Sequence, residues 1–224
     1  DELGRLSTSF NDMTGRLAEL LKSKEQLLLD VSHELRSPLT RMKVALEFLP
    51  ESKTKQSIVS DANSMQFMLT ELLESARLDS ENGTLKRSKI NFTDLIREIE
   101  QSFSARKQPI SFSFSEEDLF IPVDEMRIRM VFNNLIENAI KYSSNSEQPI
   151  EVSSKMQEDK LIVAVRDFGE GIDENELPHL FDPFYRVDKS RSKKTGGYGL
   201  GLNLCKKIIE AHQGEIEIES ELNE

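Results

Sequence analysis

The chain has 224 residues, of which 31% are charged and 37% are hydrophobic, and its net charge at pH 7 is -11. This length suits one large domain or two small ones, and the acidic balance argues against nucleic acid as the main partner, because phosphate backbones attract basic surfaces. The single cysteine, Cys205, excludes an internal disulfide and a cysteine-rich zinc site. No apolar run approaches the roughly 18 residues that span a bilayer. The chain starts without a methionine inside a helical pattern, so we expect it to be a fragment of something longer.

Residues 1–30 are predicted to form a helix, because apolar side chains recur at spacings of three and four. These side chains are Leu3, Leu6, Phe10, Met13, Leu17, Leu20, Leu21, Leu27 and Leu28. We expect the helix to continue as far as Pro50. Pro38 removes a backbone donor and crowds the carbonyl four residues earlier, so we also expect a bend near Glu34.

A second helix is predicted from about Lys55 to Asp79, after a short turn at residues 51–54. Its apolar stripe advances in steps of four and three through Ile58, Ala62, Met65, Leu69, Leu72 and Ala76. A two-helix hairpin cannot bury a wide stripe on each of its helices, whereas two copies can do so in a four-helix bundle. The pattern therefore predicts a homodimer.

Periodicity is lost over residues 80–89, which carry Gly83 and are predicted to be a linker. Beyond this linker, short strands and helices alternate. The strands are expected near residues 90–92, 110–114, 119–121, 150–152, 161–165 and 215–219, and the helices near 94–104, 124–142 and 200–212. Asp124 is expected to cap the second of these helices, and residues 170–198 to be irregular. Antiparallel strands with segregated helices indicate an α+β sandwich.

The predicted fold class is therefore α+β, with a two-helix hairpin that forms a dimeric four-helix bundle, followed by an α/β sandwich. We predict three segments along the chain. Residues 1–22 belong to a signalling helix, residues 23–82 form the dimerisation hairpin, and residues 83–224 form the sandwich domain.

Residues 31–40 read V-S-H-E-L-R-S-P-L-T and place His33 beside Glu34. An imidazole has an unperturbed pKa of about 6.5, so much of it is neutral and nucleophilic at neutral pH. A neighbouring carboxylate can orient the ring and take up its other proton. Ser37 follows one helical turn after His33, so the two side chains share a face. On these residues alone, a surface or packing histidine is the alternative.

The full string H-E-L-R-S-P-L-T resembles the phosphoacceptor motif of the sensor histidine kinases of two-component signalling. The resemblance implies that ATP phosphorylates His33, that Glu34 acts as the base, and that the phosphoryl group passes to an aspartate on a response regulator receiver domain. It also implies a homodimer and an ATP-binding module further along the chain. D-E-L-G at residues 1–4 and F-N-D-M at residues 10–13 resemble the end of a HAMP linker, the helical relay between membrane and kinase core. We therefore expect the parent to be a membrane-anchored bacterial inner-membrane protein and this chain to be cytoplasmic.

Ser37 stands where many relatives carry Thr or Asn and also dephosphorylate their regulator. Its hydroxyl can hold a water in line with the aspartyl phosphate of a regulator. The resemblance thus implies a phosphatase activity centred on Ser37. The alternative is that Ser37 merely forms local hydrogen bonds before Pro38.

Residues 134–142 read N-L-I-E-N-A-I-K-Y within a predicted helix. Asn134 and Asn138 are four residues apart and share one face of this helix. Amide oxygens are hard, neutral ligands that suit Mg²⁺, an ion that keeps several waters and is shared with substrate phosphates. For these two residues alone, a polar helix face without a ligand is the alternative.

Three further motifs follow in the second half of the chain. D-F-G-E-G at residues 167–171 comes directly after a predicted strand, and F-D-P-F-Y-R at residues 181–186 lies in the irregular segment. G-Y-G-L-G-L at residues 197–202 opens the last helix, where glycines and free N–H groups make an anion site. Arg186 and Arg191 are candidates to stabilise charge on a transferring phosphoryl group, although the basic run around Arg191 is also compatible with a solvated loop.

Together, the four motifs resemble the ATP-binding domain shared by histidine kinases, gyrase-type ATPases and the Hsp90 chaperones. The resemblance implies that the chain binds ATP and Mg²⁺. It also implies that Asn138 contacts the metal, Lys141 meets phosphate and Tyr142 packs near the nucleotide. Asp167 would accept a hydrogen bond from the adenine amino group. The other predicted nucleotide-binding residues are Asn134, Gly169, Gly171, Arg186, Gly197, Gly199, Leu200 and Gly201.

Asn134 distinguishes between two kinds of activity. Gyrase-like ATPases carry a glutamate at this position to activate water, whereas an amide cannot act as a base. The chain is therefore predicted to transfer phosphate to a protein, and the alternatives are a gyrase-like ATPase with a fortuitous histidine or an inactive relay scaffold. The family's domain usually closes with another strand, and we expect that strand to be missing after Glu224.

Overall fold

The computed structural model describes residues 2–79, 84–114, 118–143, 148–187 and 197–222. The chain divides into two compact units, a helical hairpin at Asp1–Thr84 and a mixed helix-and-strand unit at Leu85–Glu224. Among the described residues, no helix combines the length and the apolar character needed to cross a membrane.

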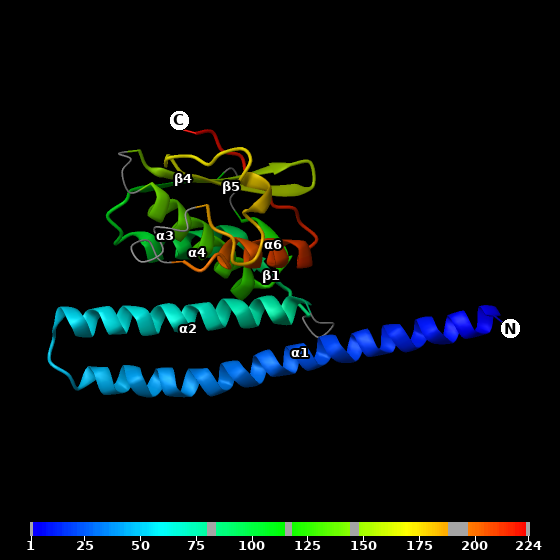
Figure 1. Cartoon of the computed structure of the whole chain (residues 1–224). Coiled ribbons are helices and arrows are strands. Elements are labelled where there is room, and N and C mark those ends of the chain that lie inside the picture. The colour runs from blue at the N-terminus through cyan, green and yellow to red at the C-terminus, as the bar shows by residue number, and fades with distance from the viewer. Residues whose placement is uncertain (1, 80–83, 115–117, 144–147, 188–196, 223–224) are drawn as a thin grey trace. The chain divides into compact units, whose positions relative to one another are not determined.

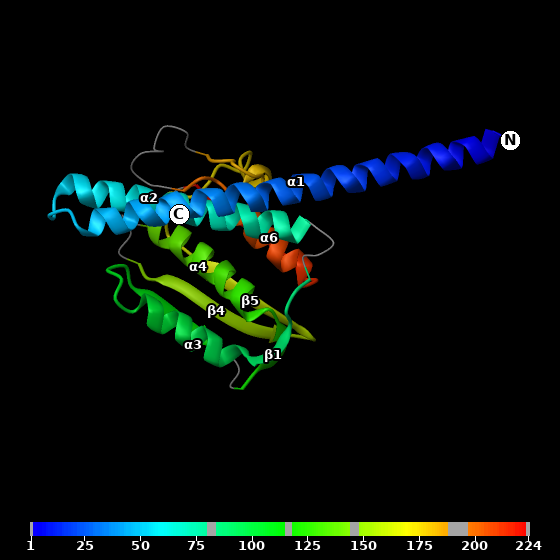
Figure 2. The same ribbon diagram turned by 90° about the horizontal axis from the view of Figure 1, so that it is seen from below.

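The hairpin consists of two long antiparallel helices, α1 (Glu2–Glu47) and α2 (Lys53–Asp79) (Figure 1). Both predicted helices are confirmed, although α1 ends before Pro50 is reached. The Lys55 N–H donates a hydrogen bond to the Ser52 hydroxyl at 3.1 Å, so Ser52 caps the start of α2. Figures 1 and 2 both show α1 projecting well beyond α2, because α1 has 46 residues and α2 has 27.

Pro38 lies inside α1, and the helix is continuous across it. The Thr40 hydroxyl donates a hydrogen bond to the Arg36 carbonyl at 2.9 Å, in the turn that contains the proline. The helix is therefore not interrupted at the place where the bend near Glu34 is predicted.

Few of the hairpin's described apolar side chains are buried. Leu39 and Leu46 of α1 and Ala62 and Leu73 of α2 are buried. Much of the predicted stripe is open to solvent, and the exposed apolar residues of the two helices include Val31, Leu35, Met42, Ile58 and Met65. A single copy of the hairpin thus leaves a broad apolar surface uncovered.

The second unit is built from five strands, three α-helices and a short 3-10 helix among its described residues. They are β1 (Ser88–Asn91), α3 (Phe92–Phe103), β2 (Ile110–Phe114), β3 (Phe120–Val123), α4 (Glu125–Tyr142), β4 (Ile150–Gln157), β5 (Lys160–Arg166), η1 (Leu177–His179) and α6 (Gly201–Ala211). Asp124 caps α4 as predicted, because its side chain accepts a hydrogen bond from the Arg127 N–H. Phe92 starts α3 rather than ending a strand, because the Asn91 side chain accepts hydrogen bonds from the Thr93 and Asp94 N–H groups.

The strands form two sheets. β1 pairs with β3 in antiparallel register, and the second sheet has the order β2-β4-β5. The β4–β5 pair is an antiparallel hairpin, but β2 pairs with β4 in parallel, with Ile110 opposite Ile150. The β2–β4 pair therefore departs from the predicted antiparallel arrangement, which the other two pairs follow. A parallel pair needs a long crossover, and α4 lies in the connection between these two strands.

Helices α3, α4 and α6 lie together on one side of β4 and β5 (Figures 1 and 2). The core lies between these helices and the strands. Its fully buried apolar side chains are Ile96, Ile99, Ile136, Ile150, Val152, Leu204, Cys205 and Ile208. The α+β fold class is thus confirmed, as a two-layer unit that buries its own core.

Residues 215–219 do not form the predicted strand. Their alternation is real, since Ile216 and Ile218 are half-buried and the glutamates between them are exposed. Their backbone, however, joins no ladder among the described residues. The neighbouring contact runs through a side chain, because the Ile172 N–H donates to the Ser220 hydroxyl at 2.9 Å.

His212 joins the end of α6 to the start of α4. Its Nε2 accepts a hydrogen bond from the Asp124 N–H at 3.0 Å, and its Nδ1 donates to the Ile208 carbonyl at 2.7 Å. Because a backbone N–H can only donate, this arrangement requires a neutral imidazole with its proton on Nδ1. Asp124 Oδ2 also accepts a hydrogen bond from the Lys86 N–H at 2.9 Å, which ties the beginning of the unit to the same point.

Candidate functional site

His33, Glu34 and Ser37 are all exposed on α1. Ser32, next to His33, is buried, so the helix turns its neighbour inward while the imidazole faces solvent. Ser37 Oγ accepts a hydrogen bond from Arg41 Nη1 at 2.8 Å. The imidazole is thus accessible to a reaction partner, one helical turn from a hydroxyl that an arginine holds in place.

Lys141 and Tyr142 form the last residues of α4. Lys141 Nζ lies 3.0 Å from the Tyr142 hydroxyl and 4.6 Å from the centre of its ring. A cation over an aromatic face is attracted by the ring's quadrupole, so the pair steadies the ammonium group. The tyrosine ring is more than half exposed, which leaves area for a further flat group to pack on it.

Asp167 and Gly169 make a tight turn against this end of α4. Asp167 Oδ1 accepts a hydrogen bond from the Gly169 N–H at 3.0 Å. A Cβ atom at Gly169 would lie 2.7 Å from the Tyr142 carbonyl oxygen, so the close approach requires glycine. The Phe168 N–H donates to the buried Ser143 hydroxyl at 3.3 Å. The turn is therefore fixed to the helix that carries Lys141.

Two cationic side chains converge on Gly197. Arg186 Nη1 donates a hydrogen bond to the Gly197 carbonyl at 2.8 Å. Lys141 Nζ lies 2.9 Å from the place that a Cβ atom of residue 197 would occupy, and the φ of Gly197 is +103°. Two positive charges beside a glycine-containing backbone can attract the negative charge of a phosphate group.

Gly199 is packed against the F-D-P-F-Y-R segment. Its carbonyl accepts a hydrogen bond from the Phe184 N–H at 2.8 Å. Its φ is +71°, and a Cβ atom there would lie 2.4 Å from the Tyr185 carbonyl oxygen. The next residue, Leu200, is buried and precedes Gly201, the first residue of α6. The glycine-rich segment is thus held between the core and the Phe184–Tyr185 backbone.

Asn134 and Asn138 are half-buried on α4, four residues apart. Their amide oxygens are the kind of hard, neutral ligand that Mg²⁺ accepts alongside water and phosphate, so this donor set fits the ion. Glu137, between them in sequence, forms an ion pair with Arg106. The carboxylate of Glu137 is therefore engaged with Arg106.

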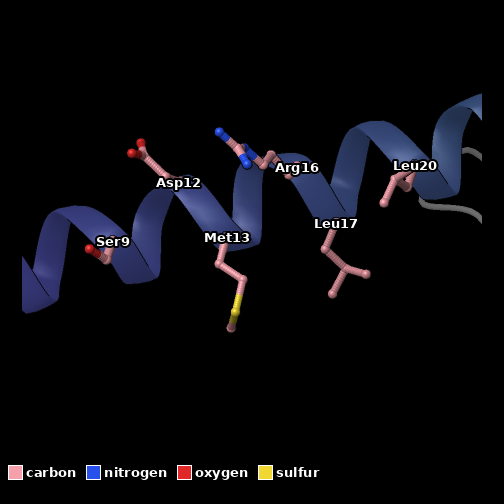
Figure 3. A pocket seen from close by; sticks show the side chains of 6 residues that line it. All are labelled: Ser9, Asp12, Met13, Arg16, Leu17 and Leu20. Atoms are coloured by element: carbon pink, nitrogen blue, oxygen red, sulfur yellow. The ribbon is translucent and has the colours of Figure 1, made fainter.

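A separate depression lies on the N-terminal half of α1. Its six lining residues are Ser9, Asp12, Met13, Arg16, Leu17 and Leu20. Figure 3 shows that all six come from this one helix, with Met13 and Leu17 directed to one side and Asp12 to the other. A single helix encloses no ligand, so this depression is not a nucleotide site.

Two families match the two units. Residues 23–81 match the His Kinase A (phospho-acceptor) domain, and residues 123–224 match the histidine kinase-, DNA gyrase B-, and HSP90-like ATPase domain. The chain belongs to the sensor histidine kinases.

Curated relatives agree with this assignment, and a solved structure shares the fold. The sensor histidine kinase YkoH of Bacillus subtilis (strain 168) is 35% identical over 98% of this chain and 50% of the relative. The signal transduction histidine-protein kinase ArlS of Staphylococcus aureus (strain USA300) is 31% identical over 100% of this chain and 52% of the relative. The crystal structure of full-length ShkA has the same fold, with a TM-score of 0.71 at 23% identity over 88% of this chain and 43% of ShkA. The chain spans about half the length of the curated relatives it matches.

Not every predicted site residue of this histidine kinase lies in the cluster around Lys141 and Gly197. A Cβ atom at Gly171 would lie 2.0 Å from the Glu221 carbonyl oxygen, so packing against the C-terminal segment explains this glycine. Arg191 lies outside the described residues. His33, Glu34 and Ser37 belong to the hairpin unit.

Several residues that shape the site of this histidine kinase carry no sequence signal that we recognised. Ser143 anchors the Asp167 turn, and the Asn203 amide donates a hydrogen bond to the Phe181 carbonyl at 2.9 Å. The Glu176 carboxylate accepts a hydrogen bond from the Tyr185 hydroxyl. Each of these contacts joins residues that lie far apart in the sequence or in an irregular segment, so only the D-F-G-E-G and F-D-P-F-Y-R motifs, which contain one partner of each contact, could have pointed to them.

Proposed function

We propose that this chain is the catalytic core of a sensor histidine kinase that phosphorylates His33 from ATP and passes the phosphoryl group to an aspartate of a response regulator. The observation that carries the proposal is the convergence of Lys141 and Arg186 on Gly197. Two cations at a glycine-containing backbone match the negative charge of a triphosphate. The exposed imidazole of His33 supports the role of phosphoacceptor.

We infer the following roles around the nucleotide. Tyr142 offers its ring to the nucleotide, and Asp167 accepts a hydrogen bond from the adenine amino group through Oδ2, because Gly169 already holds Oδ1. Asn138, with Asn134 one turn before it, holds Mg²⁺, which when bound neutralises charge on the phosphate oxygens. Lys141 and Arg186 bind the phosphate oxygens.

The chemical step is an in-line displacement at the γ-phosphorus. A nitrogen of neutral His33 forms a bond to phosphorus while the bond to the bridging oxygen breaks, and ADP leaves with that electron pair. Glu34 takes the proton from the other ring nitrogen, so the phosphohistidine stays neutral at the ring. Most of the rate enhancement comes from positioning and charge neutralisation.

We infer that the working form is a homodimer whose hairpins pair as a four-helix bundle. The exposed apolar residues of α1 and α2 support this, because a second hairpin would cover them. We also propose that the parent protein is membrane-anchored, with this chain on its cytoplasmic side. The half-length match to sensor histidine kinases supports a longer parent.

The test is incubation with γ-labelled ATP, followed by acid and base treatment of the labelled protein. We expect label that is stable to base and lost in acid, as phosphohistidine is. His33→Gln should abolish the label and keep ATP binding, whereas Asn138→Ala should weaken both. Base-stable, acid-labile label on His33→Gln would show that His33 is not the acceptor, and ATP hydrolysis without label would indicate a gyrase-like ATPase.

A second activity, dephosphorylation of the regulator, is favoured by the position of Ser37. Its Oγ is held by Arg41 and lies one turn from His33 on an exposed face. A water bound there could attack an aspartyl phosphate in line. Ser37→Ala should lower phosphatase activity by roughly tenfold, about 1.4 kcal/mol, with little change in autophosphorylation. Equal loss of both activities would instead indicate a structural role beside Pro38.

A further inference from the structure

Tyr185 is the centre of a side-chain network just before Arg186. Its hydroxyl donates a hydrogen bond to Glu176 Oε2, and this bond raises the pKa of the Tyr185 hydroxyl above its usual range. The His179 ring packs on the tyrosine ring with centres 5.3 Å apart, and His179 Nδ1 lies 3.0 Å from Asp182 Oδ2. These contacts thus join the two ends of the segment from residue 176 to residue 185.

The backbone of the same segment is joined to the glycine-rich segment. The Phe184 N–H donates to the Gly199 carbonyl, and the Tyr185 carbonyl lies so close to Gly199 that no side chain fits there. Phe184 has a φ of 66°, an unfavourable value for a residue with a side chain, so the surrounding contacts must hold it there. The Asn203 amide fixes the start of the segment through the Phe181 carbonyl.

Arg186 follows directly and donates to the Gly197 carbonyl. The hydroxyl of Tyr185 is therefore held by Glu176, and the next residue carries the guanidinium that converges with Lys141 on Gly197. A shift of about 1 Å in such a support is enough to misplace a binding or catalytic group.

We propose that Glu176 and Tyr185 are positioning residues of the nucleotide site. Their hydrogen bond fixes the Phe184–Arg186 backbone against Gly199, so that Arg186 and the glycine-rich backbone are already arranged when the phosphates arrive. This inference rests on the proposed function, since it assigns the network to nucleotide binding. In this role both residues act through the Phe184–Arg186 backbone.

The experiment measures amide hydrogen exchange in the nucleotide-free full chain and then the affinity for ADP and Mg²⁺-ATP. The variants are Tyr185→Phe, which removes only the hydroxyl, Glu176→Ala, and Glu176→Gln, which keeps an acceptor oxygen. Glu174→Ala is the matched control, because Glu174 is an exposed glutamate of the same loop.

Tyr185→Phe and Glu176→Ala should each speed exchange of the Phe184 amide by roughly tenfold and weaken nucleotide binding by a similar factor. The double variant should be no worse than either single one, because both remove the same bond. Glu176→Gln should restore most of what Glu176→Ala loses, and Glu174→Ala should match the wild type. Exchange in the core of α6, around Leu204, should not change in any variant.

Unchanged exchange at Phe184 in Tyr185→Phe would overturn the inference whether or not the protein binds nucleotide. Loss of protection throughout α6 would also overturn it, since the residues would then only stabilise the fold. If exchange responds as expected but the wild type binds neither ADP nor ATP, the proposed function fails, and the assignment of the network to a nucleotide site fails with it.

Discussion

The two units of this chain differ in how many of their apolar side chains they bury. The second unit fully buries a set of large side chains between one layer of helices and its strands, among them Ile96, Ile136 and Leu204. Among its described side chains, the hairpin buries only a few apolar ones, such as Leu39 and Leu73, and leaves residues such as Leu35 and Met65 exposed. The second unit thus buries a core of its own, whereas a single hairpin leaves an apolar surface uncovered, which is the basis of the proposed pairing of two copies.

The largest expected effect tests the core of the second unit. Ile96→Ala should lower the free energy of unfolding by about 2–5 kcal/mol, because it leaves a cavity at a fully buried site. This loss should not depend on protein concentration. Met65→Ala in the hairpin, at a position that is 46% exposed in one copy, should show a cost that rises with protein concentration. Denaturant unfolding at two concentrations measures both, and equal behaviour of the two variants would refute the comparison.

A charge on the exposed face of α1 should separate the copies. Leu35 is 42% exposed and shares its helix face with Val31 and Met42. Leu35→Lys should weaken self-association by roughly a hundredfold or more, because each dimer would bury two unpaired charges. Val44→Lys is the control, since Val44 is also exposed but lies on the opposite side of the helix. Sedimentation over a concentration series measures the effect, and a dimer as tight as the wild type would place the interface elsewhere.

A glycine-to-alanine substitution should be harmful in the second unit, where it lowers nucleotide affinity, and favourable in the hairpin, where it raises helix stability. Gly199→Ala forces a side chain into a positive φ and against the Tyr185 carbonyl, so nucleotide affinity should fall by about five- to 150-fold, or 1–3 kcal/mol. Gly15→Ala meets nothing within 4 Å in α1 and should stabilise that helix by about 0.5–1 kcal/mol. Calorimetric titration and thermal unfolding measure these changes. A harmless Gly199→Ala would show that the glycine-rich segment is not held as described.

The smallest expected effect concerns pH and belongs to the second unit alone. Burial lowers the pKa of His212, and the charges of Arg87 and Arg127 act in the same direction, while the bond to Ile208 and the charge of Asp124 oppose them. The unfolded chain therefore binds the proton more readily, so stability is complete above about pH 6.5 and is lost as the pH falls toward the lower pKa of the folded state.

His212→Gln removes this titration and keeps an oxygen that can accept the Asp124 N–H. The fall in thermal midpoint between pH 7.5 and pH 5.5 should therefore be smaller in this variant than in the wild type. His179→Gln should retain the fall. A His212→Gln profile that follows the wild type would show that another group titrates.

Local patterns predicted the helices better than the strand pairing. The long helices and the Asp124 cap were readable because apolar spacing and capping depend on residues close in sequence. The parallel pairing of β2 with β4 could not be predicted, because the alternation of residues within Ile110–Phe114 does not identify the strand with which they pair. Residues 215–219 alternate correctly and still form no strand, for the same reason.

The candidate site divides in a similar way. Motifs pointed to Lys141, Arg186 and the glycines, because charge and backbone freedom are properties of residue type. The supports of these groups depend on contacts between irregular segments, as when Glu176 meets Tyr185 or Ser143 meets Phe168. Such contacts leave no periodic trace in the sequence.

The pairing of β2 with β4 also has a consequence for the order in which the chain folds. Ile110 and Ile150 pair although forty residues separate them, whereas only a short turn joins α1 to α2. Contacts between distant residues form slowly, because the long loop between them must close first. During synthesis the hairpin can therefore form while β2, with its apolar Phe112 and Phe114, still waits for its partner strand. In the interval between the emergence of β2 and that of β4, the strand β2 thus has an unpaired edge on which another chain could assemble.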